Sequence, residues 1–317
     1  FGVVSMFSFP ISVYLPAFLV FVFFALIYLS STPNKKPFIV INLKGKILKL
    51  FLLLIFVSGS VSVFASKYAY NWVIAENHSL YAKAFYNEGL NTDSPLVKQN
   101  FFNLASGAGL EALSYNKRDS RHYSIVGSSL LLQKKPEDAI FFFKKAIDIS
   151  PFDTKNLFQL SLAYQMKPEP DLEMERKVLE FILSFDPKNV NALALLVKNL
   201  STNNRGKDAT IVYGRLKRYF EYFKGRPGFG PYHNIVGFTA VAVGDYKYAQ
   251  YIYKDAIKQF PSSAENYYNL AVIESGYLKN YKEGAYLAKK ALNLNPNMLN
   301  SDKAKILIDK YESINNQ

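Results

Sequence analysis

The chain has 317 residues, a formal charge of +13 and no cysteine. The lack of cysteine excludes disulfides, thiolate catalysis and cysteine-ligated zinc or iron in this sequence. Its histidines, His78, His122 and His233, lie far apart and form no His-x-x-x-His pattern, so we expect no metal and no cofactor. The positive charge permits an anionic partner but is also typical of a solvated basic surface, so it identifies no ligand.

An apolar run opens the chain, and no charged residue precedes Lys35. Residues 13–30 read VYLPAFLVFVFFALIYLS, about 18 residues, close to the length that a helix needs to cross a bilayer. A buried core helix is the alternative, but no amphipathic period interrupts the run. A cleaved signal peptide would start with Met and a basic segment, whereas this chain starts with Phe1. We interpret the run as a membrane span and the chain as lacking its natural start.

A second apolar run occupies residues 47–65, ILKLFLLLIFVSGSVSVFA, and predicts a second span. The connection between the runs contains lysines and no acidic residue: Lys35, Lys36, Lys44 and Lys46. The positive-inside rule places this connection in the cytoplasm. We therefore expect a multi-pass protein of a bacterial inner membrane, with its C-terminal part in the periplasm.

Two later segments share one spacing without a gap. The first has these residues at offsets 12, 16, 19 and 24 from Gly127: Ala139, Phe143, Ala146 and Pro151. The second has these at the same offsets from Gly237: Ala249, Tyr253, Ala256 and Pro261. Small residues let two helices cross closely, an aromatic ring fills the next layer, and proline ends the hairpin. The pattern resembles the tetratricopeptide repeat (TPR), a helical hairpin of about 34 residues.

Weaker copies flank these two segments. Residues 153–187 need about two extra turn residues, residues 266–296 need one insertion, and residues 189–224 are divergent. The predicted fold is all-α: two transmembrane helices in residues 1–66, a helical adaptor in 67–118 and a TPR solenoid in 119–317. An amphipathic helix at 302–313 is expected to cap the stack.

Stacked TPR hairpins form a concave groove lined by the first helix of each pair, where partner peptides bind. The family positions in that groove correspond to these residues: Arg121, Lys155, Phe158, Asn234 and Tyr268. Each is equally compatible with an ordinary solvated side chain.

The run GRLKRYFEYFKGRP is a second candidate surface. Its cations could bind phosphate or an acidic sugar: Arg215, Lys217, Arg218, Lys224 and Arg226. The alternative is a solvated helix face with Tyr219, Phe220 and Phe223 partly in the core.

No nucleophile elbow, zinc helix or nucleotide loop is present, so the chain alone contains no predicted catalytic site. The segment MFSFPISVYLPAFLVFVFFALI resembles the late membrane segment of bacterial O-antigen ligase and polymerase family proteins, some of which continue into a periplasmic TPR tail. That family uses arginines and a histidine in earlier loops, so no catalytic residue transfers to this chain. The resemblance implies a docking arm of a glycan transferase in polysaccharide biosynthesis.

The competing interpretation is a stand-alone membrane-anchored TPR scaffold or assembly chaperone, which resembles the cytochrome c maturation proteins. Those have a much longer cytoplasmic loop than this chain. The partners expected from both interpretations are a protein or peptide and the lipid bilayer. A lipid-linked or acidic glycan is a further expected partner, and nucleic acid is not.

Overall fold

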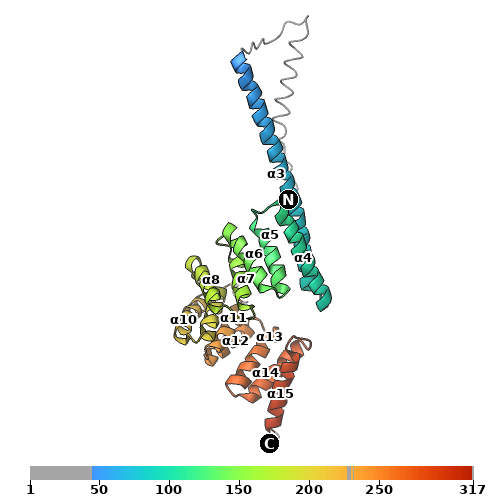
Figure 1. Cartoon of the computed structure of the whole chain (residues 1–317). Coiled ribbons are helices and arrows are strands. Elements are labelled where there is room, and N and C mark those ends of the chain that lie inside the picture. Colours follow the sequence, from blue (N-terminus) through green and yellow to red (C-terminus); the bar gives the residue numbers. More distant parts are fainter. Residues whose placement is uncertain (1–44, 227–229, 231, 316–317) are drawn as a thin grey trace. The chain divides into compact units, whose positions relative to one another are not determined.

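A computed structural model describes residues 45–226, 230 and 232–315, which form helices without any strand (Figure 1). The first predicted span, at 13–30, and most of the basic connection lie outside these residues. The chain divides into two compact units, Phe1–Gln133 and Lys134–Gln317.

The N-terminal unit contains three described helices: α3 (Gly45–Asn91), α4 (Pro95–Tyr115) and α5 (Ser120–Leu132). Pro95 opens α4, where its missing N–H leaves no hydrogen bond unmade. Helix α4 packs against both α3 and α5. Its Phe102 ring is 2% exposed and lies so close to Gly89 of α3 that a Cβ there would be 2.6 Å away. Small residues thus set the approach of these helices.

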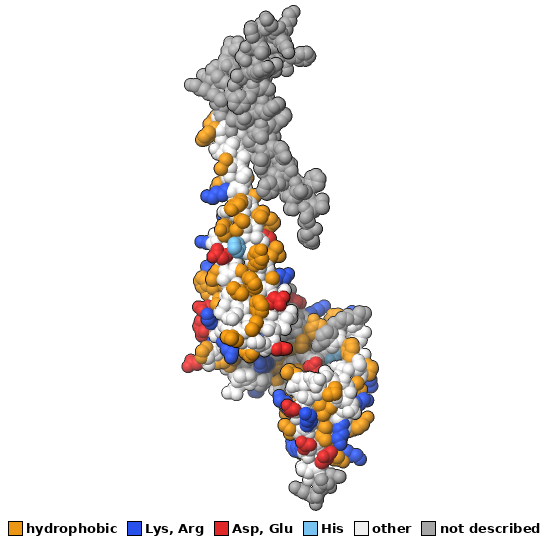
Figure 2. Space-filling view, turned by 90° about the vertical axis from the view of Figure 1, so that its right-hand side faces the viewer, with side chains coloured by type: hydrophobic (Ala, Val, Ile, Leu, Met, Phe, Trp, Pro, Cys, Tyr) orange, Lys and Arg blue, Asp and Glu red, His pale blue; other side chains and the backbone are white. Residues whose placement is uncertain are grey.

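The second predicted span falls within α3, which runs without a break from Gly45 to Asn91. Several apolar side chains along it are exposed, including Phe56 at 73% and Phe64 at 75%. Figure 2 shows apolar side chains over the surface of the N-terminal unit, interspersed with a few charged ones. Within the described part of the chain, no helix provides a continuous apolar stretch that could span a bilayer. Both spans stay predictions.

The C-terminal unit is a succession of helices, each packed against the next. They are α6 (Pro136–Ile149), α7 (Thr154–Gln165), α8 (Leu172–Phe185), α9 (Val190–Thr202), α10 (Gly206–Phe223), α11 (Tyr232–Ala242), α12 (Tyr246–Gln259), α13 (Ala264–Val272), the π-helix η1 (Ile273–Tyr277), α14 (Tyr281–Leu294) and α15 (Ser301–Asn315). Helix α9 also contacts α11, and α13 contacts α15. Contacts between alternate helices are those of stacked hairpins (Figure 1). The prediction of an all-α hairpin array is confirmed for this unit, and α15 occupies the place of the predicted cap.

The predicted spacing marks a close helix crossing. Ala249, Tyr253 and Ala256 of α12 are buried, none more than 1% exposed. A Cβ at Gly237 of α11 would lie 2.6 Å from the Tyr253 ring. Glycine is therefore needed at this position because the aromatic ring of the second helix fills its side-chain space.

The turns that precede α10, α12 and α14 each contain a left-handed residue that sequence spacing does not reveal. Asn204, Gly244 and Lys279 have φ of 55°, 81° and 62°. Each lies two residues before the first residue of a second helix, and Asp245 then caps α12 by accepting a hydrogen bond from the Tyr248 amide at 3.2 Å. This conformation reverses the chain in few residues, so the two helices of a hairpin lie antiparallel.

Candidate functional site

Two of the predicted groove residues lie one turn apart on α7. Lys155 is exposed and Phe158 is half-buried. Asp153 caps this helix and accepts a hydrogen bond from the Lys155 amide at 3.0 Å. The pair offers a cation and an aromatic ring on one helix.

Asn234 of α11 and Tyr268 of α13 are less accessible than expected. Asn269 donates a hydrogen bond from Nδ2 to Asn234 Oδ1 at 3.3 Å, which ties α11 to α13. Tyr268 is only 8% exposed, and burial raises its pKa. In the described structure no hydrogen bond or ion pair joins any two of the five predicted residues. Lys155 and Phe158 share α7, whereas Asn234 lies on α11, Tyr268 on α13 and Arg121 on α5 of the N-terminal unit.

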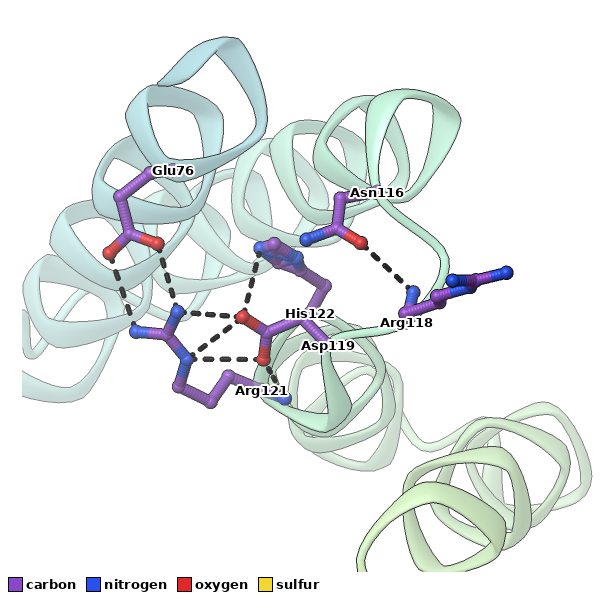
Figure 3. A network of polar contacts seen from close by, with 6 residues as sticks. All are labelled: Glu76, Asn116, Arg118, Asp119, Arg121 and His122. Atoms are coloured by element: carbon purple, nitrogen blue, oxygen red, sulfur yellow. Dashed lines mark hydrogen bonds and ion pairs between the residues drawn. The ribbon is translucent and has the colours of Figure 1, made fainter. Parts of the chain in front are cut away.

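Arg121 is the centre of a polar network in the N-terminal unit (Figure 3). Its guanidinium donates from Nη2 to Glu76 Oε2 at 2.9 Å and to Asp119 Oδ2 at 2.6 Å. Nε donates to Asp119 as well, at 3.1 Å. Burial raises the pKa of Asp119, but its hydrogen bonds with Arg121 outweigh this and hold the pKa below its usual value. A partner at Arg121 would therefore compete with two carboxylates.

The same network includes a buried imidazole without a hydrogen-bond partner. His122 is 1% exposed, neither ring nitrogen is hydrogen-bonded, and Nε2 lies 3.9 Å from Asp119 Oδ2. Burial is the main cause that lowers its pKa. Glu76, Asp119 and His122 place one ligand atom each within 4.8 Å of one another, a donor set that suits a divalent cation. Arg121, however, already occupies both carboxylates and supplies the compensating charge, so the network is complete without an ion.

The predicted basic run begins within α10 and continues past its end at Phe223, and its cations have different surroundings. Lys217 Nζ lies 3.2 Å from Asp245 Oδ2 and 3.9 Å from the centroid of the Tyr248 ring. Lys224 pairs with Glu221 at 2.5 Å, and the hydrogen bond from Lys224 to Glu221 raises its pKa. Both lysines thus form internal contacts of the C-terminal unit.

Arg215 and Arg218 of α10 line a cavity of about 510 Å³, called here the basic–aromatic cavity. Its lining residues are Lys188, Arg215, Arg218, Tyr219, Tyr222 and Phe223. Lys188 comes from the turn between α8 and α9, and the rest come from α10. Sequence reasoning missed Lys188, since nothing in the run around α10 indicates which distant turn packs beside it.

A second cavity of about 510 Å³ lies among α6, α7 and α8 and was also missed. Phe141, Leu157 and Phe181 contribute to an apolar lining, and Lys144 and Lys177 also border it. Phe181 stacks on Phe152, whose side chain is 67% exposed. Exposed aromatic side chains of this kind often mark a contact surface.

Comparison with solved structures returns TPR proteins. The chain is similar to the APC/C Cut9–Hcn1 hetero-tetramer. This match has 12% sequence identity and a TM-score of 0.50, and it covers 84% of this chain and 51% of that chain. YrrB, a TPR protein with an unusual peptide-binding site, matches with 20% sequence identity and a TM-score of 0.41, and the match covers 63% of this chain and 98% of that chain. A thermophilic TPR protein in Thermus thermophilus matches with 18% sequence identity and a TM-score of 0.37, and the match covers 73% of this chain and 97% of that chain.

At these identities the likeness concerns the fold alone. Together with the stacked hairpins, it defines the chain as an all-α helical-repeat protein of the TPR type. No protein-family model and no curated protein matches the sequence.

Proposed function

We propose that this chain is a membrane-anchored TPR docking arm that binds a protein or peptide partner. The observation that supports this most directly is the array of hairpins, in which α9 contacts α11 and α13 contacts α15. Stacked first helices present an extended row of side chains and contain no inherent chemistry. Binding, rather than catalysis, is the function that such a surface supports.

The anchoring part of the proposal rests on the two apolar runs, residues 13–30 and 47–65. Apolar side chains in the first half of α3 are exposed, such as Val63 at 72%. Transfer of each such side chain from water into lipid would be favourable. Orientation follows from the lysines between the runs, which put the TPR region in the periplasm of a bacterial inner membrane.

We further propose that the arm belongs to an O-antigen ligase- or polymerase-like glycan transferase, on the strength of the first apolar segment and the order of domains. A lipid-linked or acidic glycan would then be handled near the arm. A stand-alone scaffold or assembly chaperone of the cytochrome c maturation type is the alternative. The upstream reading frame discriminates the two, because only the transferase requires many further spans with an arginine-bearing periplasmic loop.

The absence of cysteine makes single-cysteine labelling a clean topology test. A membrane-impermeant maleimide added to cells with a permeabilised outer membrane should label Lys258→Cys, which lies at an exposed position of α12. Lys36→Cys, in the connection between the runs, should be labelled only after lysis. The reverse pattern would overturn the orientation, and labelling of both would overturn the anchor.

Partner binding is tested by a photo-crosslinking amino acid placed at Lys155 or Phe158 of α7. A discrete adduct is expected at these positions in membranes, and its partner would be identified by mass spectrometry. Tyr286 of α14 is 58% exposed and is the control position. Equal adducts at Tyr286 would show that the groove is not the binding surface.

A further inference from the structure

We propose that the basic–aromatic cavity binds an acidic segment of a protein partner, with carboxylates on its arginines and an apolar side chain against its rings. The inference rests on the proposed protein-binding function. It adds a second binding surface, formed by α10 and the turn before α9, to the groove predicted on the first helices.

The charge of the cavity is uncompensated. No acidic side chain lines it, and in the described structure neither the Lys188 nor the Arg218 side chain has an ion pair or hydrogen bond. Arg215 donates only to the carbonyl oxygen of Pro187, at 3.3 Å. By contrast, Lys217 of the same helix and Lys224, the residue after its end, are paired with acids. Three cations left without carboxylates around one cavity favour an anionic ligand.

The neighbouring helix start adds to this positive potential. A smaller cavity of about 260 Å³ shares Lys188 and Phe223 with the first and reaches Val190, the first residue of α9. The Asn189 side chain accepts a hydrogen bond from the Ala192 amide at 3.0 Å, and the positive end of the helix dipole still attracts anions. The one acid in this smaller cavity, Asp186, accepts a hydrogen bond from the Asn189 side-chain amide at 2.8 Å.

The rings favour a peptide over a stacked base or sugar. The Arg226 guanidinium lies 4.7 Å from the centroid of Tyr222 and 4.9 Å from that of Phe223. The two rings also meet edge to face at 4.8 Å. Ring faces covered in this way are poor platforms for nucleobases, which need an open face for stacking. Arginine and tyrosine are, in turn, the residue types enriched at the energetic centres of protein interfaces.

The test uses the full chain in detergent and a fluorescent peptide of Asp and Glu flanking one Phe, measured by anisotropy. Its matched control peptide has Asn and Gln in place of the acids. We expect the acidic peptide to bind and the amide peptide to bind at least about tenfold more weakly, since each charge-assisted hydrogen bond contributes about 1.5–3 kcal/mol.

The variant Arg215→Gln/Arg218→Gln should weaken binding at least about tenfold. Lys207→Gln/Lys247→Gln removes the same charge from exposed positions outside the cavity and should weaken it less than about threefold. Arg218→Gln alone removes no hydrogen bond or ion pair of the described structure and lies at an exposed position, so a loss of binding with an unchanged melting temperature is attributed to the cavity.

Equal losses in the control variant, or equal binding of the amide peptide, would overturn the proposal. So would tighter binding of a single-stranded oligonucleotide or heparin that depends on the same arginines. The crosslinks at Lys155 and Phe158 separate the two hypotheses. If they persist while the peptide does not bind, only the cavity proposal falls, and if they too are absent, the protein-binding function falls.

Discussion

Substituting Gly237 by alanine tests the helix crossing on which the repeat depends. The added Cβ would lie 2.6 Å from Cζ and 2.8 Å from Oη of Tyr253. That ring is 1% exposed, meets Phe238 edge to face at 6.2 Å, and donates from its hydroxyl to the Asn234 carbonyl at 3.5 Å. It has no free space to enter, so α11 and α12 must separate.

Overpacking of this kind costs about 1–3 kcal/mol, and alanine returns about 1 kcal/mol through its higher helix propensity. We therefore expect Gly237→Ala to lower the free energy of unfolding by about 1 kcal/mol, or the melting temperature by about 2–4 °C for a unit of this size. Circular dichroism of the full chain during heating measures this change.

Gly214→Ala is the matched control, because a Cβ at that position of α10 meets nothing within 4 Å. It should gain stability by about 0.5–1 kcal/mol. Combining Gly237→Ala with Tyr253→Leu should recover part of the loss, with a coupling of at least about 0.5 kcal/mol. Stabilisation by Gly237→Ala equal to that of Gly214→Ala, or zero coupling, would refute the close crossing.

Three further substitutions have defined outcomes. Gly284→Ala should destabilise by about 3 kcal/mol, measured by denaturant unfolding, because its Cβ would lie 2.9 Å from Ser275 Cβ and 3.1 Å from the Ala271 carbonyl oxygen. Burial raises the pKa of Glu175, so the contribution of this group to stability falls as pH rises above about 4.5. Glu175→Gln should therefore raise the melting temperature at pH 8 and leave it nearly unchanged at pH 4. Burial lowers the pKa of His122 below 6.5, so the folded state binds fewer protons and stability falls as pH drops below about 6.5. His122→Leu should flatten this fall in melting curves from pH 7.5 to pH 5, and an unchanged slope would contradict the assignment.

The repeat is the part of the fold that sequence predicts best. Gly237 and Tyr253 lie 16 positions apart, a spacing fixed by one helix, one tight turn and the next helix, so the contact is local. The left-handed turn residues Asn204 and Lys279 were not predicted, because neither is glycine. Their conformation is imposed by the packing of the helices on either side.

In the N-terminal unit, the predicted boundary between the second span and the adaptor does not coincide with a break in the helix. Sequence reasoning separated a membrane region ending at residue 66 from an adaptor beginning at 67, whereas α3 continues through this point to Asn91. No proline follows residue 37 before residue 95, so nothing in the chain interrupts the helical hydrogen bonds. A change of polarity marks a change of environment and need not mark a break in the helix.

The basic run of α10 shows how far helical period alone could have refined the site. Arg215, Arg218 and Tyr222 follow one stripe at i, i+3 and i+7, and Lys217 and Lys224 follow another. Period separates these stripes without saying which one meets an acid, because Asp245, the partner of Lys217, is 28 positions away. Only the fold assigns the second stripe to internal pairs and leaves the first uncompensated. The capacity of this surface to bind an anion therefore depends on which acids the neighbouring helices place beside it, and on where they place none.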